Sequence, residues 1–323
     1  MTIDILIPTY NRKNYLKKAI DSILIQSYKN INIIISDNNS NDWTNVLVNE
    51  YLLNYENIFY YEQVINIWAL NNFKKCIYKY SSSDYLLFLS DDDELYDKDY
   101  IKKAIQLLEN NKDISIVMSN TKIVYEDLDL KFNKYQKLAK IINWKDFFIN
   151  YWTWDYSISW CNAIFNRKLA IENDCYNWKI FYADSDCFFR LMMFWNIWFI
   201  NTIWSIYRLH GKNSYKLANV DNYINNASYI TRNYNFAKKY IEKDKIEQWK
   251  ERMFTTYFNT VYNNLILFSD NPLKNIKKIK EYLSENNIYI NKSWVNLFIL
   301  FTARYLMKIK LFHKIMILLN NQK

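Results

Sequence analysis

Glycine is almost absent from this chain of 323 residues: Gly211 is the only one, and there are only two prolines. A typical chain is about 7% glycine. The shortage excludes two common phosphate-binding motifs that need several glycines, G-x-G-x-x-G and G-x-x-x-x-G-K-[ST]. We therefore expect neither a dinucleotide-binding enzyme nor a P-loop nucleoside triphosphatase.

Tryptophan, in contrast, occurs twelve times. A coding bias toward A and T would explain the abundance of Asn, Ile, Lys and Tyr and the low glycine content, but it should lower tryptophan too. Some bacterial lineages read the codon UGA as glycine, and we hypothesise that many of these tryptophans are glycines in the organism. The alternative is a genuinely tryptophan-rich protein. The tryptophans in question stand where a turn or loop favours glycine: Trp43, Trp152, Trp154, Trp160, Trp195 and Trp198.

Secretory and membrane features are also missing. The first residues lack the basic and long apolar regions of a secretory signal, and no uncharged apolar run reaches the ~18 residues of a spanning helix. No C-x-x-C pair occurs, so the cysteines are interpreted as reduced, mostly buried thiols. We expect a cytoplasmic protein with a sizeable core, built as one large domain with an appendage or as two domains. The four cysteines are Cys76, Cys161, Cys175 and Cys187.

Positive charge is concentrated at one end of the chain. The net charge is +9, and residues 272–323 carry ten lysines and arginines against Glu281 and Glu285, a local charge of +8. Such a patch suits nucleic acid, anionic lipid or a solvated face. Residues 295–319 fit either a basic amphipathic helix lying on a membrane or a helix packed on the rest of the chain.

The hydrophobic pattern of residues 3–120 alternates short apolar runs with helical periodicity, which is typical of βαβ units. The expected fold class is α/β, with a Rossmann-like, mostly parallel sheet flanked by helices. The pattern from about residue 215 predicts a helical C-terminal region. We expect strands at 3–8, 31–36, 58–61, 85–89, 114–120, 161–165 and 199–206, and helices at 16–24, 101–108 and 184–194.

Polar residues follow three of these strands, at 8–12, 36–40 and 90–94. The carboxyl ends of parallel strands meet at one edge of a sheet, so these segments should line one crevice. Residues 91–94 are four carboxylates in a row, which repel one another unless a cation or a ligand's donors offset them. Mg2+ and Mn2+ prefer such oxygen ligands. The plain alternative is a solvated acidic turn that caps the helix after Asp97.

Together, the segments Ile-Pro-Thr-Tyr-Asn-Arg (7–12), Ser-Asp-Asn-Asn-Ser-Asn-Asp (36–42) and Phe-Leu-Ser-Asp-Asp-Asp-Glu (88–94) resemble the nucleotide-sugar half of a family 2 glycosyltransferase with the GT-A fold. The resemblance covers roughly the first 210 residues, and the combination is specific although each motif alone is weak. It implies a metal bridging the diphosphate, with Asp92 as its ligand and Asp93 nearby. It also implies a nucleotide-sugar site made of Pro8, Thr9, Tyr10, Arg12, Asp37, Asn38 and Asp91.

Within that implied site, the backbone and ring at Thr9 and Tyr10 pack on the base, Asn38 reads the edge of the base, and Asp91 binds the ribose. Many relatives carry Asp at the position of Asn38, which weakens the assignment of uracil.

Two further segments support the resemblance. Residues 182–191 resemble the family's catalytic-base segment, with Asp184 as the base that deprotonates the acceptor hydroxyl in an inverting transfer. Ala183 replaces the usual Glu, and taken alone Asp184 suits a helix N-cap. In residues 207–214 the resemblance places Arg208 and His210 near the diphosphate or metal, although an isolated histidine is more often structural.

The resemblance bears on the glycine hypothesis as well. Family members commonly have glycine at the positions of Trp43 and Trp68, and Trp160 is another such place. A genuine Trp68 beside the crevice could block the site.

The sequence therefore predicts a metal-dependent inverting glycosyltransferase using Mn2+ or Mg2+. Its donor would be a hexose or N-acetylhexosamine on a nucleoside diphosphate, UDP in the first place, and its acceptor a glycan or lipid-linked molecule in surface polysaccharide synthesis. We expect a catalytic domain at 1–214, divided into a nucleotide-sugar half (1–120) and an acceptor half (121–214), and a basic helical region at 215–323. The expected location is cytoplasmic, with possible contact to the inner face of the cell membrane and no nucleic-acid partner.

Two alternatives remain open at this point. One is a degenerate, non-catalytic GT-A protein that binds nucleotide sugar, glycan or membrane. The other is a sugar nucleotidyltransferase, for which Asn11-Arg12-Lys13 is a poor substitute for a Gly- and Lys-rich phosphate loop.

Overall fold

The computed structural model describes residues 1–134, 138, 140–151, 163–177, 183–193, 195–210 and 219–290, with the side chains of Lys134, Ala183, Asp184, Leu267 and Phe268 excepted. Two compact units are present, and residues 219–290 belong to the second. The first consists of residues 1–124 and most of 133–208. The domain boundary expected near residue 214 stays a prediction.

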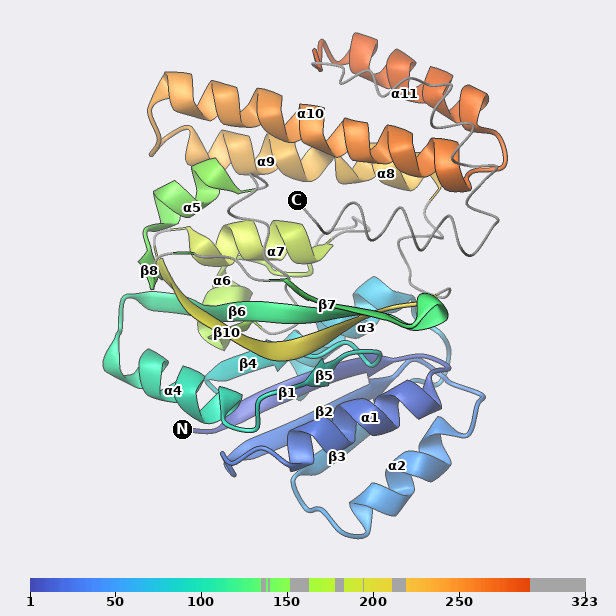
Figure 1. Cartoon of the computed structure of the whole chain (residues 1–323), viewed down its shortest axis with the longest axis vertical. Coiled ribbons are helices and arrows are strands. Elements are labelled where there is room, and N and C mark those ends of the chain that lie inside the picture. Colours follow the sequence, from blue (N-terminus) through green and yellow to red (C-terminus); the bar gives the residue numbers. More distant parts are fainter. Residues whose placement is uncertain are drawn as a thin grey trace. The chain divides into compact units, whose positions relative to one another are not determined.

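The first unit is organised around a sheet in which strands follow the order β3-β2-β1-β4-β9-β6-β10-β5. The short strands β7 (Leu130–Lys134) and β8 (Ile141–Ile142) lie off this path. Figure 1 shows the sheet with its flanking helices. The strands on the path are β1 (Ile3–Thr9), β2 (Ile31–Asp37), β3 (Ile58–Glu62), β4 (Tyr85–Phe88), β5 (Glu94–Leu95), β6 (Ile114–Tyr125), β9 (Ile164–Asn166) and β10 (Asn196–Leu209).

The N-terminal strands pair in parallel. β1 pairs in parallel with β2 and β4, and β2 pairs in parallel with β3. β9 pairs antiparallel with β4 and β6, and β10 pairs antiparallel with β5 and β8. The expected parallel sheet is thus the N-terminal part of a mixed sheet.

Burial explains why these segments form strands. All seven residues of β1 are buried, as expected for a parallel strand covered on both faces. Asp4 is the one charged residue in β1, and its carboxylate accepts hydrogen bonds from Asn32 Nδ2 and from the backbone N–H groups of Ser82 and Ser83 at 2.7–2.9 Å. These bonds fasten the start of β1 to β2 and to the turn before β4.

Helix α1 packs on the sheet of the first unit through one apolar stripe. Leu16, Ala19, Ile20 and Ile23 are spaced by three or four residues along α1, and they belong to the core cluster with β1 and β2. Figure 1 shows α1 and α2 in front of the parallel strands. The helices of this unit are α1 (Lys13–Leu24), α2 (Thr44–Leu52), α3 (Ala69–Lys75) with a π-helical turn at Cys76–Tyr80, α4 (Tyr100–Asn110), α5 (Trp144–Asn150), α6 (Arg167–Glu172) and α7 (Ala183–Met192).

Residues 219–290 of the second unit are mostly helical, which confirms the expectation for this part of the chain, and the unit also includes residues 125–132. Its helices are α8 (Val220–Asn226), α9 (Ser228–Ala237), α10 (Lys243–Phe268) and α11 (Pro272–Glu285). The Tyr257 hydroxyl on α10 donates to the Tyr223 carbonyl of α8 at 2.6 Å. Within the described ranges, no helix combines the length and apolar character needed to cross a membrane. Residues 295–319, for which two kinds of helix were considered, lie outside the described residues.

Most of the expected elements are confirmed, with shifted ends. β6 extends to Tyr125 rather than 120, β10 begins at Asn196, and β4 ends at Phe88. β9 is formed by Ile164–Asn166, whereas the strand was expected at 161–165, and residues 161 and 162 lie outside the described range. Helix α7 begins at Ala183, and Phe194, the expected helix end, is likewise outside it.

Candidate active site

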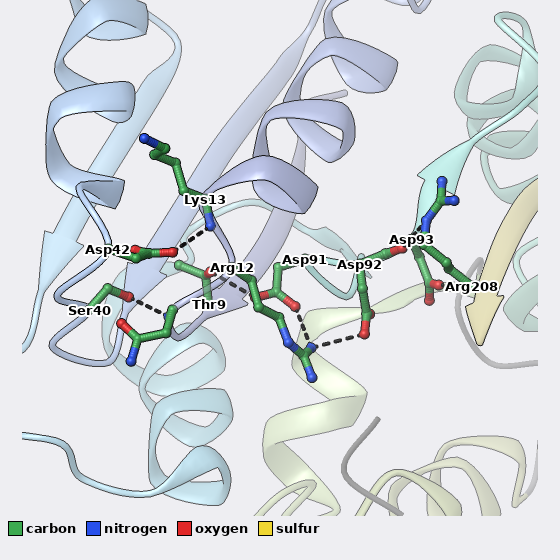
Figure 2. A network of polar contacts seen from close by, with 10 residues as sticks. Thr9, Arg12, Lys13, Ser40, Asp42, Asp91, Asp92, Asp93 and Arg208 are labelled. Carbon is green, nitrogen blue, oxygen red and sulfur yellow. Dashed lines mark hydrogen bonds and ion pairs between the residues drawn. The ribbon is translucent and has the colours of Figure 1, made fainter. Parts of the chain in front are cut away.

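The polar segments that follow β1, β2 and β4 come together, because these strands are neighbours in register. Thr9 at the end of β1 is paired with Asp37 at the end of β2, and Leu6 of β1 is paired with Phe88 of β4. Their carboxyl ends therefore lie at one edge of the sheet, as expected for a crevice in an α/β protein. Figure 2 shows the polar contacts that link them.

Arg12 connects the segments after β1 and β4. Its Nη1 atom lies 2.8 Å from Asp91 Oδ1 and 2.9 Å from Asp92 Oδ2, and Figure 2 shows both carboxylates turned toward it. The other oxygen of Asp91 accepts a hydrogen bond of 2.7 Å from the Thr9 hydroxyl. One cation thus lies between two carboxylates that would otherwise repel each other.

Asp91 and Asp92 are both buried, so water does little to stabilise their charges. Asp91 is 3% exposed and Asp92 7% exposed. Desolvation raises the pKa of Asp91 to about 6, against the opposing effect of Arg12, and the neighbouring Asp92 charge adds to the rise. The pKa of the Arg12 guanidinium is raised, since the attraction of Asp91 and Asp92 outweighs the desolvation that lowers it.

Asp93 lies apart from this pair. Figure 2 shows it at Arg208, whose backbone N–H donates to Asp93 Oδ1 at 2.9 Å. Burial raises the pKa of Asp93 well above its usual range, and the charge of Asp92 raises it further. Among the described residues, Asp93 Oδ2 has no hydrogen-bond partner. The Arg208 side chain contacts Glu94 and donates from Nε to the Asp92 carbonyl at 3.2 Å.

Hydrogen bonds between loops hold the segments after β1 and β2 against each other. The backbone N–H of Asn11 donates to Ser40 Oγ at 2.9 Å, and that of Lys13 to Asp42 Oδ2 at 2.8 Å. Burial opposes ionisation of Asp42, but the bonds from Lys13 and Thr44 keep its pKa below the usual value. Asp42 thus accepts a hydrogen bond from the first residue of α1. Pro8 is buried at the end of β1, and Tyr10 is half-exposed beside it.

Asp37 and Asn38 are both buried, and their side chains are engaged within the protein. Asp37 accepts from Tyr60 Oη at 2.7 Å and from the Ser40 N–H at 2.9 Å, and burial together with this bond raises the pKa of Tyr60. Asn38 Oδ1 accepts from the Ile67 N–H at 2.9 Å, and its Nδ2 donates to Asn66 Oδ1 at 3.0 Å. Base reading by Asn38 therefore stays a prediction, and it requires Asn38 to share or exchange these partners.

The loop at 66–68 and Tyr60 were not selected from the sequence. The sequence does carry one signal for the loop, since Asn66-Ile67-Trp68 is a segment in which the family commonly has glycine. No local pattern predicts that its amide groups would pair with Asn38, because 28 residues separate Asn38 from Asn66.

The remaining predicted site residues lie elsewhere in the chain. Asp184 is the second residue of α7, and its side chain lies outside the described residues. Asp186, two residues further on, is buried and forms an ion pair with Arg190 at 3.1 Å. His210 is buried and belongs to the second unit. The catalytic role of Asp184 and the metal-ligand role of His210 stay predictions.

The donor set suits a hard divalent cation held in part by a ligand. Asp91, Asp92 and Asp93 supply carboxylate oxygens, and the buried Asp93 Oδ2 lacks a partner in the described part of the chain. The described residues contain no group of three or more protein ligands already gathered for a metal. A cation with one or two carboxylates plus phosphate and water, the usual arrangement for Mg2+, is compatible with both facts.

Comparison with known proteins gives consistent results. Residues 4–174 match the family model "Glycosyl transferase family 2". The uncharacterized glycosyltransferase MG025 of Mycoplasma genitalium is 36% identical over 104 residues, which is 31% of this chain and 34% of MG025. The GalNAc(5)-diNAcBac-PP-undecaprenol beta-1,3-glucosyltransferase of Campylobacter jejuni is 27% identical over 220 residues, or 67% of each protein. The chain thus spans about a third of MG025 and two thirds of the Campylobacter protein.

A solved structure confirms the predicted fold class. TarS from S. aureus, crystallised with UDP-GlcNAc, has a TM-score of 0.68 and 16% identity, covering 88% of this chain and 80% of that one. The likeness supports a GT-A fold, with a mixed sheet flanked by helices and a helical C-terminal region. Because the family model matches more than half of the residues, the chain belongs to glycosyl transferase family 2.

Proposed function

We propose that this protein is an inverting glycosyltransferase that moves a hexose or N-acetylhexosamine from a nucleoside diphosphate, UDP in the first place, to a glycan or lipid-linked acceptor. The relatives support this. The Campylobacter protein bears the name of an undecaprenol-linked glycan glucosyltransferase, and TarS was crystallised with UDP-GlcNAc. The product would enter surface polysaccharide synthesis.

The observation that carries the proposal is the contact of Thr9 and Arg12 with Asp91 and Asp92 at the carboxyl ends of β1 and β4. Each oxygen of Asp91 accepts one hydrogen bond in this network and has a second lone pair free by geometry. A ribose hydroxyl can therefore donate to Asp91 without displacing Thr9. Tyr10, half-exposed at the same edge, supplies a ring on which the base packs.

The diphosphate needs positive charge at this edge. Asp92 and Asp93 would hold Mn2+ or Mg2+, and such a cation supplies Lewis-acid stabilisation of the leaving nucleoside diphosphate. Arg12, held by Asp91 and Asp92 in this structure, has N–H groups that can turn to phosphate oxygens. Arg208 presents a second guanidinium beside Asp92.

Proton removal from the acceptor is assigned to Asp184. As a carboxylate at the start of α7, it takes the proton of the acceptor hydroxyl while that oxygen attacks the anomeric carbon on the side opposite the leaving diphosphate. The configuration at the anomeric carbon is thereby inverted. Attack from a lipid-linked acceptor places the protein at the cytoplasmic face of a membrane, and the basic residues of 272–323 suit that location.

A donor screen with the purified full chain tests the proposal. Release of UDP from UDP-hexoses and UDP-N-acetylhexosamines is measured with Mn2+, with Mg2+ and with EDTA, in the presence of lipid-linked and soluble glycans. We expect turnover that requires the cation and falls at least a hundredfold in Asp92→Ala and in Asp184→Ala. Glu172→Ala, an exposed acid paired with Lys168 on α6, is the matched control and should keep full activity.

Donor binding separates the alternatives. A protein that binds UDP-sugars without turnover would be the degenerate, non-catalytic GT-A protein. Activity that survives Asp184→Ala would overturn the role of Asp184 and leave the donor site intact. Absence of both binding and turnover for every nucleoside diphosphate sugar would overturn the proposal as a whole.

A further inference from the structure

We infer that residues 43 and 68 are glycines in the protein that the organism makes, encoded by UGA codons read as glycine. The inference rests on backbone conformation and exposure and is independent of the proposed function. Both residues stand directly before a helix: Trp43 before α2 and Trp68 before α3.

The backbone at residue 68 has φ 68° and ψ 152°. This region, with positive φ and fully extended ψ, is essentially restricted to glycine, because the Cβ atom of any other residue collides with the backbone. The conformation is fixed by contacts on both sides. The Trp68 N–H donates to Asn66 Oδ1 at 2.9 Å, and the Trp68 carbonyl accepts from the Asn72 N–H at 3.1 Å to form the first turn of α3.

Residue 43 has φ 67° and ψ 25°, which is the left-handed helical region. Asn and Asp enter this region fairly often, whereas a bulky aromatic residue there is an outlier. Its carbonyl accepts from the Leu47 N–H at 3.2 Å, and the preceding residue, Asp42, holds the start of α1 through Lys13. The left-handed turn is thus required between two helix starts.

Neither tryptophan gains packing that would offset this strain. Trp43 is 71% exposed and Trp68 is 80% exposed. Tyr176 is an aromatic residue in which packing offsets the strain of a positive φ. Its ring is buried, and the ring centroid lies 5.3 Å from that of Phe73 and 5.0 Å from that of Phe88. The other residues with positive φ in the described ranges are all Asn or Asp: Asn11, Asn39, Asp129, Asp174 and Asn287.

Several other described tryptophans are buried. The glycine hypothesis drawn from composition is therefore restricted here to residues 43 and 68. Trp204 and Trp249 are fully buried, and Trp198 is 6% exposed. The Trp204 ring packs against Tyr100 with a centroid distance of 4.3 Å. Trp198 does not have positive φ, so its backbone does not require glycine. Trp152, Trp154 and Trp160 lie outside the described residues.

Both positions lie in loops that hold the candidate site. Position 68 follows Asn66 and Ile67, which pair with the buried Asn38, and position 43 follows the Asp42 contact to α1. Glycine at these positions relieves the strain and removes two exposed indole rings from the loops. The competing explanation is that a real indole stacks on a ligand and that the strain is kept for this function.

The first experiment identifies the residues directly. The codons at 43 and 68 are read from the organism's DNA, and the natural protein is digested and analysed by mass spectrometry. We expect UGA codons and peptides with the mass of glycine at both positions, and UGG codons with tryptophan at 204 and 249. Tryptophan in the natural peptide at either position overturns the inference for that position.

The second experiment uses recombinant protein that carries tryptophan at every site. Trp43→Gly and Trp68→Gly should each raise the thermal midpoint, and Trp43→Ala and Trp68→Ala should raise it less, because alanine keeps the Cβ atom. Trp204→Gly, the buried control, should lower it, and Asn39→Gly should change it little. Glycine variants no more stable than the alanine variants would contradict the inference.

Discussion

At the scale of single residues, the structure depends on Arg12 as the counter-charge for two buried carboxylates. Asp91 and Asp92 follow an apolar strand and cannot both be charged in a buried position without a nearby cation. Arg12 is held by Asp91 and Asp92 and is largely buried itself, with 22% of its side chain exposed. A divalent cation bound to the same carboxylates would take over the role of Arg12.

The first prediction follows from this exchange of counter-charges. Arg12→Gln should lower the free energy of unfolding of the metal-free protein by about 2–3 kcal/mol, because two buried carboxylates lose the cation that contacts both of them. Mn2+ should restore a larger part of the stability in Arg12→Gln than in the wild type. Lys17→Gln, which breaks an exposed pair with Asp21, is the control and should change the stability far less. Urea unfolding with EDTA and with Mn2+ provides the measurement.

The second prediction concerns pH. The folded-state pKa of Asp91 is raised to about 6, so the folded protein binds more protons than the unfolded chain between the ordinary carboxyl pKa and about pH 6. The stability associated with protonated Asp91 is therefore fully present below about pH 4 and is lost as pH rises through about 6. We expect the metal-free protein to lose roughly 2–3 kcal/mol over this window.

Comparison with Asp91→Asn isolates the effect, because the variant cannot titrate at this position. The difference in unfolding free energy between wild type and variant should change between pH 4 and 6 and stay constant above. A difference that is independent of pH, or that grows in favour of the wild type as pH rises, would contradict the raised pKa.

At the scale of elements, α3 is fastened to the sheet by a buried polar network. Asn72 Nδ2 donates to the Ser36 carbonyl of β2 at 2.7 Å, and the Ser36 hydroxyl donates to Asn72 Oδ1 at 2.6 Å. Gln63 joins the network through Ser36 Oγ at 3.3 Å and accepts from Lys75 Nζ at 2.6 Å. The network also fixes the start of α3, and so the loop at 66–68.

The third prediction tests this attachment. Asn72→Ala leaves the buried Ser36 groups without their side-chain partner and should lower the free energy of unfolding by about 2–3 kcal/mol. Asn71→Ala, whose exposed side chain bonds to the Ile67 carbonyl, should cost less than about 1 kcal/mol. If nucleotide binds at this edge, Asn72→Ala should also weaken UDP binding, measured by calorimetry, more than Asn71→Ala does. Equal effects of the two substitutions on stability would contradict the role given to the network.

The elements of the N-terminal half follow from local pattern, and the rest does not. Alternation of apolar runs and helical periodicity predicts β1, α1, β2, β3, β4 and α4, since each is buried on a face that its own sequence repeats. The antiparallel half depends on pairings between distant segments, such as Ile116 with Phe165. A strand of two residues such as β5 has no periodicity to detect. Its pairing with Ser205 and Ile206 exists only in the folded sheet.

The candidate site likewise has some features that the local sequence predicts and others that it does not. Asp91, Asp92 and Thr9 could be selected because they follow strands, and the topology brings such ends together. The engagement of Asn38 with the loop at 66–68, and the position of Asp93 at Arg208 instead of beside Asp92, depend on the course of loops. The left-handed backbone at Trp43 was foreseeable from its polar turn. The stricter glycine conformation at Trp68 was indicated only by the family resemblance.

At the scale of the whole molecule, the charge is unevenly distributed. Residues 272–323 contribute +8 of the net +9. In the described part of this segment, α11 buries Ile279 and Leu283 and exposes Lys274, Lys277 and Lys280. A helix with one apolar stripe packed on its own unit and lysines outward gives a positive surface without inserting into a bilayer. Attraction to anionic lipid would then be electrostatic and sensitive to salt.

The fourth prediction is that the full chain sediments with vesicles containing phosphatidylglycerol at low salt and is released as the salt concentration rises past a few hundred millimolar. Vesicles of phosphatidylcholine alone should not retain it.

Each lysine near an anionic surface contributes roughly 1 kcal/mol. The triple variant Lys274→Gln, Lys277→Gln, Lys280→Gln should therefore bind at least tenfold more weakly. Lys18→Gln, Lys102→Gln, Lys112→Gln makes the same change of charge on the first unit, and it should bind nearly as well as the wild type. Equal losses in the two triple variants would mean that only net charge matters. Failure of the wild type to bind would mean that the lysines of 272–323 form a solvated face, and the lipid-linked acceptor would then have to reach the site without electrostatic help from this segment.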